Sequence, residues 1–322
     1  MRHSTLVELA DLHGVRLPES LRDNWPPRLS ATDEKGWFRF QRLYDLARSV
    51  LRTEDDVRRL LRETAEDEAA EGSGWLEIQV DPSGYGGWFG GITAFTDLVL
   101  DAAAAAARET GVGVAIIIAA NRTRHPLDAR TLARLASQYA GRGVVGFGLS
   151  NDERRGVIED FAHAFRIASR SGLLAAPHAG ELCGPDSVRG CLDRLGATRL
   201  GHGVRSVEDR SLLGRIAAGG VTLEVCPASN VALGVYRKPG DVPLRTLLDD
   251  GARVALGADD PLLFGSRLVD QYESARSAHG FTDRELAALA RVSIEDSAAP
   301  SDVRARLLAG VDAWLASDEG VT

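Results

Sequence analysis

The sequence predicts an α/β fold built around a parallel β-sheet. From Trp75 onward, short apolar runs alternate with longer helical stretches, which is the spacing of right-handed βαβ units. The chain of 322 residues can bury one large core, and α/β barrels of this length commonly form one domain. We therefore expect a single domain over residues 1–322, with extra helices at its N-terminal side and at its C-terminus.

The residues before Trp75 predict helices without strands. Thr5–Leu17 carries a stripe of leucines, and Phe38–Leu51 and Glu54–Glu71 also have helical periodicity. Asp23–Lys35 contains prolines and predicts a loop. More helix is expected from Leu268 onward.

Seven strands and six helices are predicted for the alternating region. The strands are expected at Trp75–Val80, Val112–Ala119, Val144–Leu149, Leu173–Pro177, Arg199–Gly201, Thr222–Cys226 and Arg253–Leu256. The helices are expected at Ile92–Thr110, Leu127–Tyr139, Val157–Ser171, Asp186–Leu195, Val207–Ala218 and Pro243–Asp250. A closed barrel of this kind needs eight strands, so the count is one short. An open doubly wound sheet is the alternative, although no Gly-x-Gly-x-x-Gly or phosphate-loop motif follows the early strands.

Composition narrows the class of protein. The net charge of −8, without a basic cluster, argues against nucleic acid as a partner. Three cysteines without Cys-x-x-Cys spacing are typical of a reduced cytoplasmic protein. We find no signal peptide, and the longest apolar run, Val112 to Ala120, is too short to span a membrane. The sequence therefore predicts a soluble cytoplasmic protein.

Two histidines and a glutamate follow neighbouring predicted strands. His178 and Glu181 lie three residues apart, and Gly180 between them allows the backbone to turn sharply. His202 lies between two glycines after the next strand. Taken singly, they are more simply a core histidine, a surface glutamate and a loop histidine. Because polar residues at the C-terminal ends of barrel strands usually serve the active site, we expect them to share one pocket.

Two adjacent carboxylates, Asp259 and Asp260, follow the last predicted strand. They repel each other unless a cation or a shared proton is present. A turn or a helix N-cap before Pro261 is the alternative explanation. Histidine nitrogens and carboxylate oxygens are good zinc ligands, and a catalytic zinc leaves one position for water. The set favours metal-assisted hydrolysis, with a protonated glutamate as general acid.

Four motifs in order resemble the adenosine deaminase family of the metal-dependent amidohydrolase superfamily. They are His178-Ala179-Gly180-Glu181, Leu200-Gly201-His202-Gly203, Glu224-Val225-Cys226-Pro227-Ala228-Ser229-Asn230 and Asp259-Asp260-Pro261. The resemblance extends over most of the chain. It implies a (β/α)8 TIM-type barrel, one zinc ion per chain, and hydrolytic deamination of a 6-aminopurine nucleoside to the 6-oxopurine and ammonia. The implied place of such an enzyme is purine metabolism.

The resemblance also implies a role for each site residue. His178 and Asp259 would be zinc ligands, and Asp259 would also orient the hydroxide. Glu181 would protonate N1 of the purine while water attacks C6, and His202 would act as the base. Asp260 would hydrogen-bond N7, and Asn151 and Gly180 are expected to contact the substrate.

The sequence departs from the family pattern near its beginning. The family carries a His-x-His pair on its first strand, which supplies two zinc ligands, and this sequence has no such pair. Met1-Arg2-His3-Ser4 resembles the segment just after it, so we expect the barrel in this chain to lack its first strand because the chain starts too late. The alternative is a nucleoside-binding pseudoenzyme whose metal site has decayed.

A second departure concerns the substrate. The family's Asp-Leu-Ala-Gly-Asp-Glu segment appears here as Gly148-Leu149-Ser150-Asn151-Asp152-Glu153. In adenosine-specific members, the glycine at the Asn151 position offers its backbone N–H to purine N3. The Asn151 side chain alters the shape of the pocket there, so adenosine, adenine and aminodeoxyfutalosine are all candidate substrates.

Overall fold

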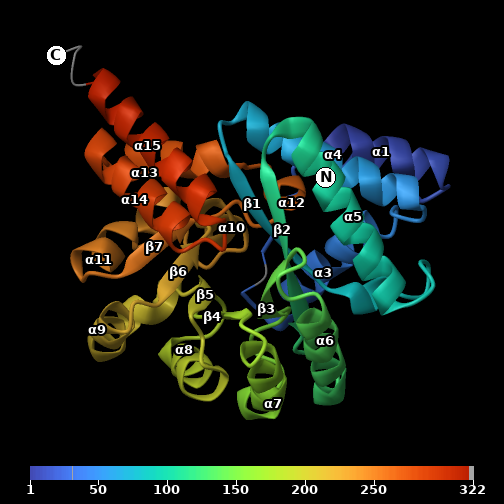
Figure 1. The fold of residues 1–322 in the computed structure, drawn as a ribbon, viewed down its shortest axis with the longest axis horizontal. Coiled ribbons are helices and arrows are strands. Elements are labelled where there is room, and N and C mark those ends of the chain that lie inside the picture. Colours follow the sequence, from blue (N-terminus) through green and yellow to red (C-terminus); the bar gives the residue numbers. More distant parts are fainter. Residues whose placement is uncertain (31, 319–322) are drawn as a thin grey trace.

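A curved parallel sheet forms the centre of the molecule in the computed structural model, which describes residues 1–30 and 32–318 (Figure 1). Its seven strands lie side by side in the order of the sequence, and each is parallel to the next. They are β1 (Trp75–Val80), β2 (Gly113–Asn121), β3 (Val144–Ser150), β4 (Leu174–Ala179), β5 (Arg199–His202), β6 (Thr222–Val225) and β7 (Arg253–Leu256). Ala31, in the predicted loop, and residues 319–322, at the end of the predicted domain, lie outside the described residues.

The sheet curls as a barrel does but stays open between β1 and β7. Among the described residues, these two edge strands pair only with β2 and β6, and no strand precedes the first helix. All six residues of β1 are half-buried, whereas most of β2 is buried. The prediction of a barrel that lacks one strand is thus confirmed by the sheet order.

Helices follow the strands and cover the outer side of the curved sheet (Figure 1). The principal ones are α5 (Ile92–Thr110), α6 (Pro126–Gln138), α7 (Ile158–Ser169), α8 (Pro185–Gly190), α9 (Arg210–Ala218) and α11 (Leu244–Asp249). Local chemistry sets several ends: Gly111 closes α5 in the left-handed conformation, Pro126 begins α6, and Asp209 caps α9 through the Leu212 N–H at 3.0 Å.

Further helices lie at both ends of the chain. Before β1 come α1 (His3–Leu12), α2 (Glu19–Arg22), α3 (Glu34–Arg48) and α4 (Glu54–Ala70). After β7 come α12 (Pro261–Phe264), α13 (Leu268–His279), α14 (Asp283–Glu295) and α15 (Ser301–Asp318). None of the helices in residues 1–30 and 32–318 has both the length and the apolar character to cross a membrane.

Some predicted boundaries were wrong for local reasons. The first helix ends at Leu12 rather than Leu17, because Gly14 turns the chain with φ of 64°. Helix α3 begins at Glu34 rather than Phe38, because Asp33 caps it by accepting from the Gly36 N–H at 2.6 Å. The sequence also failed to predict the short α10 (Pro227–Ala232), which starts with a proline inside one of the motifs.

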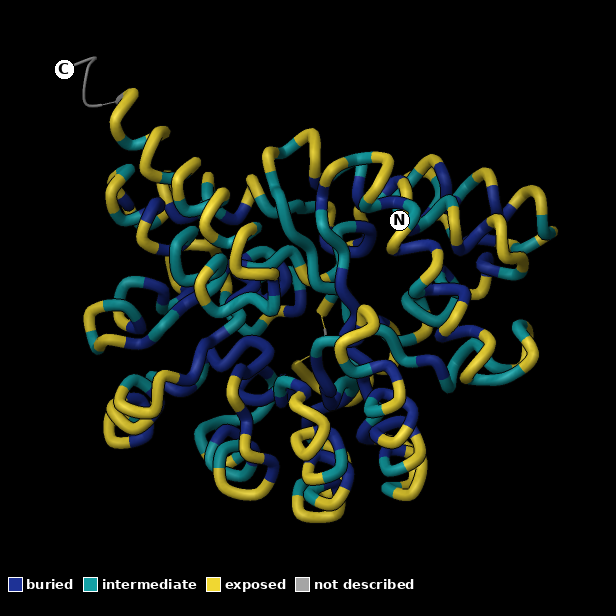
Figure 2. The backbone as a smooth tube through the Cα atoms, in the orientation of Figure 1, coloured by how far each residue is buried: buried dark blue, intermediate teal, exposed yellow. Residues whose placement is uncertain are grey.

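Two groups of buried side chains stabilise this arrangement. Figure 2 shows the exposed residues mainly on the outer turns of the surrounding helices and the buried ones toward the sheet. The larger lies between the sheet and its surrounding helices, with Phe147 of β3 meeting Phe165 of α7 edge to face at 5.1 Å. The smaller joins α1–α3 to α12, where Phe40 stacks on Phe264 at 6.0 Å. The second group holds the N-terminal helices over the strand ends that carry the predicted site. The expected single domain over 1–322 stays a prediction.

Candidate active site

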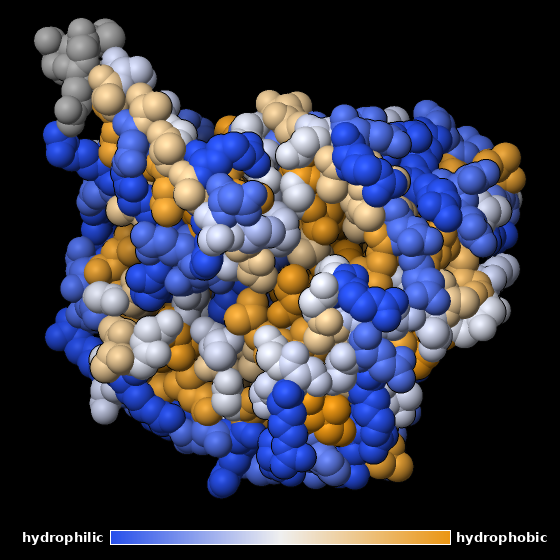
Figure 3. All heavy atoms as spheres, viewed as in Figure 1, coloured by the Kyte–Doolittle hydropathy of each residue, from blue (hydrophilic) through white to orange (hydrophobic). Residues whose placement is uncertain are grey.

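A cavity of about 1270 Å³ opens at the C-terminal ends of the strands and runs between β1 and β7. The face shown in Figure 3 is hollowed near its middle, where hydrophobic side chains are visible inside a hydrophilic surround. The predicted residues that line the cavity are Asn151, His178, Glu181, His202, Asp259 and Asp260. Six residues from four separate segments therefore meet at one cavity.

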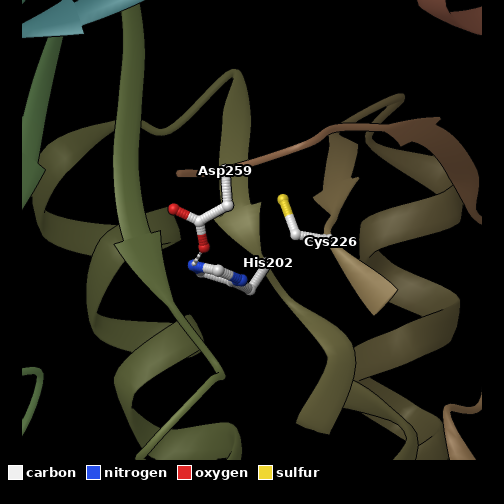
Figure 4. A group of neighbouring side chains, drawn as sticks. All are labelled: His202, Cys226 and Asp259. Carbon is white, nitrogen blue, oxygen red and sulfur yellow. Dashed lines mark ion pairs between the residues drawn. The ribbon is translucent and has the colours of Figure 1, made fainter. Parts of the chain in front are cut away.

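His202 is the centre of the polar contacts in this cavity. It is buried at the end of β5, and its Nε2 lies 3.5 Å from Glu181 Oε1. The same atom lies 3.9 Å from Asp259 Oδ2 (Figure 4). Its ring lies 5.2 Å from that of His178, centroid to centroid. Asn230, which is fully buried on α10, places its Nδ2 3.3 Å from His202 Nδ1. The structure thus joins the ends of β4, β5 and β7 around one imidazole.

Asp259 and Asp260 leave β7 without forming the simple helix cap that was the alternative explanation. Asp260 occupies the N-cap position of α12, but its side chain makes no capping hydrogen bond. Both side chains line the cavity instead. The pair is therefore available for ligands or substrate.

Backbone strain is concentrated at this site. Among the described residues, the non-glycine positions with positive φ are Asn151 at 77°, His202 at 66° and Asp259 at 57°. All three were predicted as site residues. Side chains in this conformation carry an energetic cost and persist where the surrounding structure imposes them, often at functional sites.

The side chains fit a zinc ion by their chemistry. The donor atoms of His202, Cys226 and Asp259 all lie within 4.8 Å of one another (Figure 4). The Nδ1 atom of His178 is buried without a hydrogen-bond partner. Two imidazoles, a thiol and a carboxylate are the ligands that zinc takes in proteins. His178 and Asp259 as the metal ligands stay predictions, and Cys226 is a further donor that the sequence did not single out.

Burial and neighbouring charges shift the titration of four groups. Burial raises the pKa of Glu181 to about 7, and burial together with Asp259 raises the pKa of Asp260 to about 7. Burial lowers the pKa of His178 to about 3, so this ring is neutral, the form that binds metals. Burial also acts to lower the pKa of His202, but Glu181 and Asp259 outweigh it and the pKa is raised.

Asn151 and Gly180, the two residues predicted to contact the substrate together with Asp260, already form hydrogen bonds within the protein. The Asn151 side chain donates from Nδ2 to Gln41 Oε1 of α3 at 3.2 Å and accepts from the Asp152 N–H at 2.7 Å. The Gly180 N–H donates to Glu153, and its carbonyl accepts from the Arg205 N–H at 2.9 Å. A polar contact between Gly180 and a substrate would have to displace one of these partners. Gly180 also needs its positive φ of 72° and lacks room for a Cβ, which would lie 2.7 Å from Val188.

Comparison with known proteins identifies the chain's relatives. The family model described as adenosine deaminase matches residues 1–314. The chain belongs to the adenosine deaminase family. It is therefore a hydrolase of the amidohydrolase superfamily that acts on a carbon–nitrogen bond of a cyclic amidine, as the sequence predicted.

Individual relatives cover nearly the whole chain. A Streptomyces virginiae protein named "Putative adenosine/adenine deaminase" is 66% identical over 98% of this chain and 93% of its own length. The crystal structure of adenine deaminase from Arthrobacter aurescens is 30% identical, with a TM-score of 0.88 over 98% of this chain and 95% of that one. A zinc-bound amidohydrolase from Burkhoderia ambifaria, 24% identical over 100% of this chain and 90% of its own, shares the fold with a TM-score of 0.87.

Proposed function

We propose that this chain removes the 6-amino group of an aminopurine by hydrolysis, and that free adenine is its preferred substrate. The observation that carries the proposal is that His202 Nε2 lies 3.5 Å from Glu181 and 3.9 Å from Asp259, at the C-terminal ends of three strands. A general acid, a general base and a metal ligand are what this hydrolysis requires. The pseudoenzyme alternative is not favoured, because these groups are all present and converge.

Each side chain has a defined task in this reaction. Glu181, protonated, donates to purine N1 as the oxygen of water adds to C6, and His202 accepts the proton of that water. Asp260, also protonated, donates to N7. His202 then passes that proton to the amino group on C6, the C6 hydroxyl gives its proton back to Glu181, and ammonia leaves the 6-oxopurine. Zinc, held by His178 and Asp259, would supply a hydroxide near neutral pH when bound.

The preference for adenine rests on the wall opposite Glu181. With N1 at Glu181, N3 at the Asn151 N–H and N7 at Asp260, the N9 edge faces the space between Asn151 and Asp260. Helix α3 lies along that side of the cavity: Gln41 bonds Asn151, and Tyr44, one turn later, interacts electrostatically with Asp260. The side-chain amides of Asn151 and Gln41 already hydrogen-bond each other at this wall. A sugar on N9 would have to break this bond, whereas a free base would not.

Ammonia release from adenine and from adenosine, with zinc per chain measured by elemental analysis, tests the proposal. We expect zinc in the purified chain and a kcat/KM for adenine at least about tenfold above that for adenosine. Zinc-loaded protein that releases no ammonia from any 6-aminopurine would refute the deaminase function. Faster turnover of adenosine would refute the preference alone.

A further inference from the structure

One carboxylate holds the loop that carries the predicted general acid. Glu153 lies just after β3, is 7% exposed, and accepts hydrogen bonds from four consecutive backbone N–H groups. The donors are those of Gly180, Glu181 at 3.0 Å, Leu182 at 2.7 Å and Cys183 at 2.9 Å. Successive amides that converge in this way form an anion-binding nest, and here the anion is part of the protein.

Arg122 completes this connection from the end of β2. The guanidinium, 2% exposed, donates from Nη2 to the carbonyl of His178 and from Nη1 to that of Glu153 at 3.4 Å. The Arg122 guanidinium therefore hydrogen-bonds the backbone of both segments that the Glu153 carboxylate joins, the one that follows β3 and the one at the end of β4. The loop from His178 to Cys183 is held by its carbonyl at one end and by its amides at the other.

We propose that Glu153, supported by Arg122, is a positioning residue that aims Glu181 and His178 into the cavity. The catalytic consequence of this positioning rests on the proposed function, whereas the hydrogen bonds themselves do not depend on it. Within the described part of the chain, Glu153 makes no hydrogen bond or ion pair with His202 or Asp259, although its charge acts on Glu181 and His202 at longer range. Its hydrogen bonds reach the site through the backbone of 180–183. Hydrogen bonds to a charged group are strong, and removing the acceptor would leave buried N–H groups without partners.

The consequence for the chemistry follows from the short distance between Glu181 and His202. Their closest atoms are 3.5 Å apart, and Glu181 also lies 3.5 Å from Asn230 Nδ2. A small rotation of the loop would separate these groups. A displacement of about 1 Å in a catalytic group can lower the rate about a hundredfold.

The test compares Glu153→Gln, Glu153→Asp and Glu153→Ala with the wild-type chain. Glutamine has the same shape, but it loses the charge and turns an NH2 group toward backbone donors. We expect amide hydrogen exchange over 180–183 to accelerate at least about tenfold in Glu153→Gln. We also expect kcat to fall roughly 10–100-fold with little change in KM. Glu153→Asp, which keeps the charge, should recover part of both effects.

Asp56→Asn is the matched control. Asp56 is also a buried carboxylate that accepts two backbone N–H groups, those of Arg52 at 2.9 Å and Thr53 at 2.8 Å, but it lies at the start of α4. This variant should lower Tm without changing kcat or exchange at 180–183. Equal losses of kcat in Asp56→Asn and Glu153→Gln would show a merely structural role and overturn the proposal.

The readouts separate this inference from the proposed function. Exchange at 180–183 that stays as slow in Glu153→Gln as in the wild type would overturn the positioning role, whatever the activity. If the zinc-loaded wild-type chain deaminates no aminopurine while Glu153→Gln still accelerates exchange there, the proposed function fails and the role of Glu153 in holding the loop is supported.

Discussion

Glu181 and His202 lie in contact, with 3.5 Å between Oε1 and Nε2, although Glu181 follows β4 and His202 ends β5, 21 positions later in the chain. Both side chains are buried. In such surroundings the charge on one strongly affects the proton on the other. The pKa of each group is raised, which makes Glu181 a weaker acid that holds its proton to higher pH and His202 a stronger base, as an acid–base pair needs.

The pH dependence of the reaction should report on Glu181. The pKa of this carboxyl is raised to about 7, chiefly by burial, so the protonated form that donates to N1 is lost as the pH rises through that value. We expect kcat/KM to fall about tenfold per pH unit above about pH 7. Steady-state rates between pH 5 and 9, with zinc content measured at each pH, check this. A rate that stays level from pH 7 to 9 would contradict protonated Glu181 as the acid.

Replacing Glu181 by glutamine should remove the acid while keeping the shape of the site. We expect kcat to fall roughly 10²–10⁴-fold, because that is the usual contribution of a general acid, with zinc content unchanged. Glu63→Gln is the control, since Glu63 is a buried carboxylate on α4, bonded to Thr5 and Arg59. Near-normal turnover in Glu181→Gln would rule out the assigned role.

Asp259 should affect metal content as well as rate. Asp259→Asn is the suitable substitution, because asparagine tolerates the φ of 57° better than alanine does. We expect zinc per chain to drop to a small fraction of the wild-type value, since the neutral amide is a poor metal ligand beside a carboxylate. Elemental analysis after dialysis measures this, with Glu181→Gln as the variant that keeps its metal. An unchanged stoichiometry would remove Asp259 from the ligand set.

The Asn151 side chain should control access of a sugar. Asn151→Gly fits the φ of 77° and removes the bond to Gln41, which opens the wall along the N9 edge. We expect kcat/KM for adenosine relative to adenine to rise roughly tenfold. Gln41→Leu is the companion variant, because it breaks the same bond but keeps the bulk of the wall. A ratio that is the same in Asn151→Gly and the wild type would mean that α3 does not set the choice.

Local periodicity was enough to predict much of the fold. The boundaries of β1 and β7 and of α5 agree with the prediction residue for residue, because each is an apolar or helical run closed by turn-forming residues. The open edge between β1 and β7 was also expected from the strand count. The residues at strand ends, such as His178 and Asp259, were predicted because parallel strands bring their C-terminal ends to one edge.

Contacts between distant segments could not be predicted from local patterns in the sequence. Glu153 bonds amides 27 to 30 positions away, and Asn151 bonds a glutamine 110 positions away. The spacing of residues along the chain does not predict such pairs, because they depend on how the loops after β3 and β4 turn and on where α3 packs. The sequence determined which chemical groups reach the strand ends. Only the tertiary structure decided which of them touch, since hydrogen bonds are set by distances of a few ångströms that no periodicity encodes.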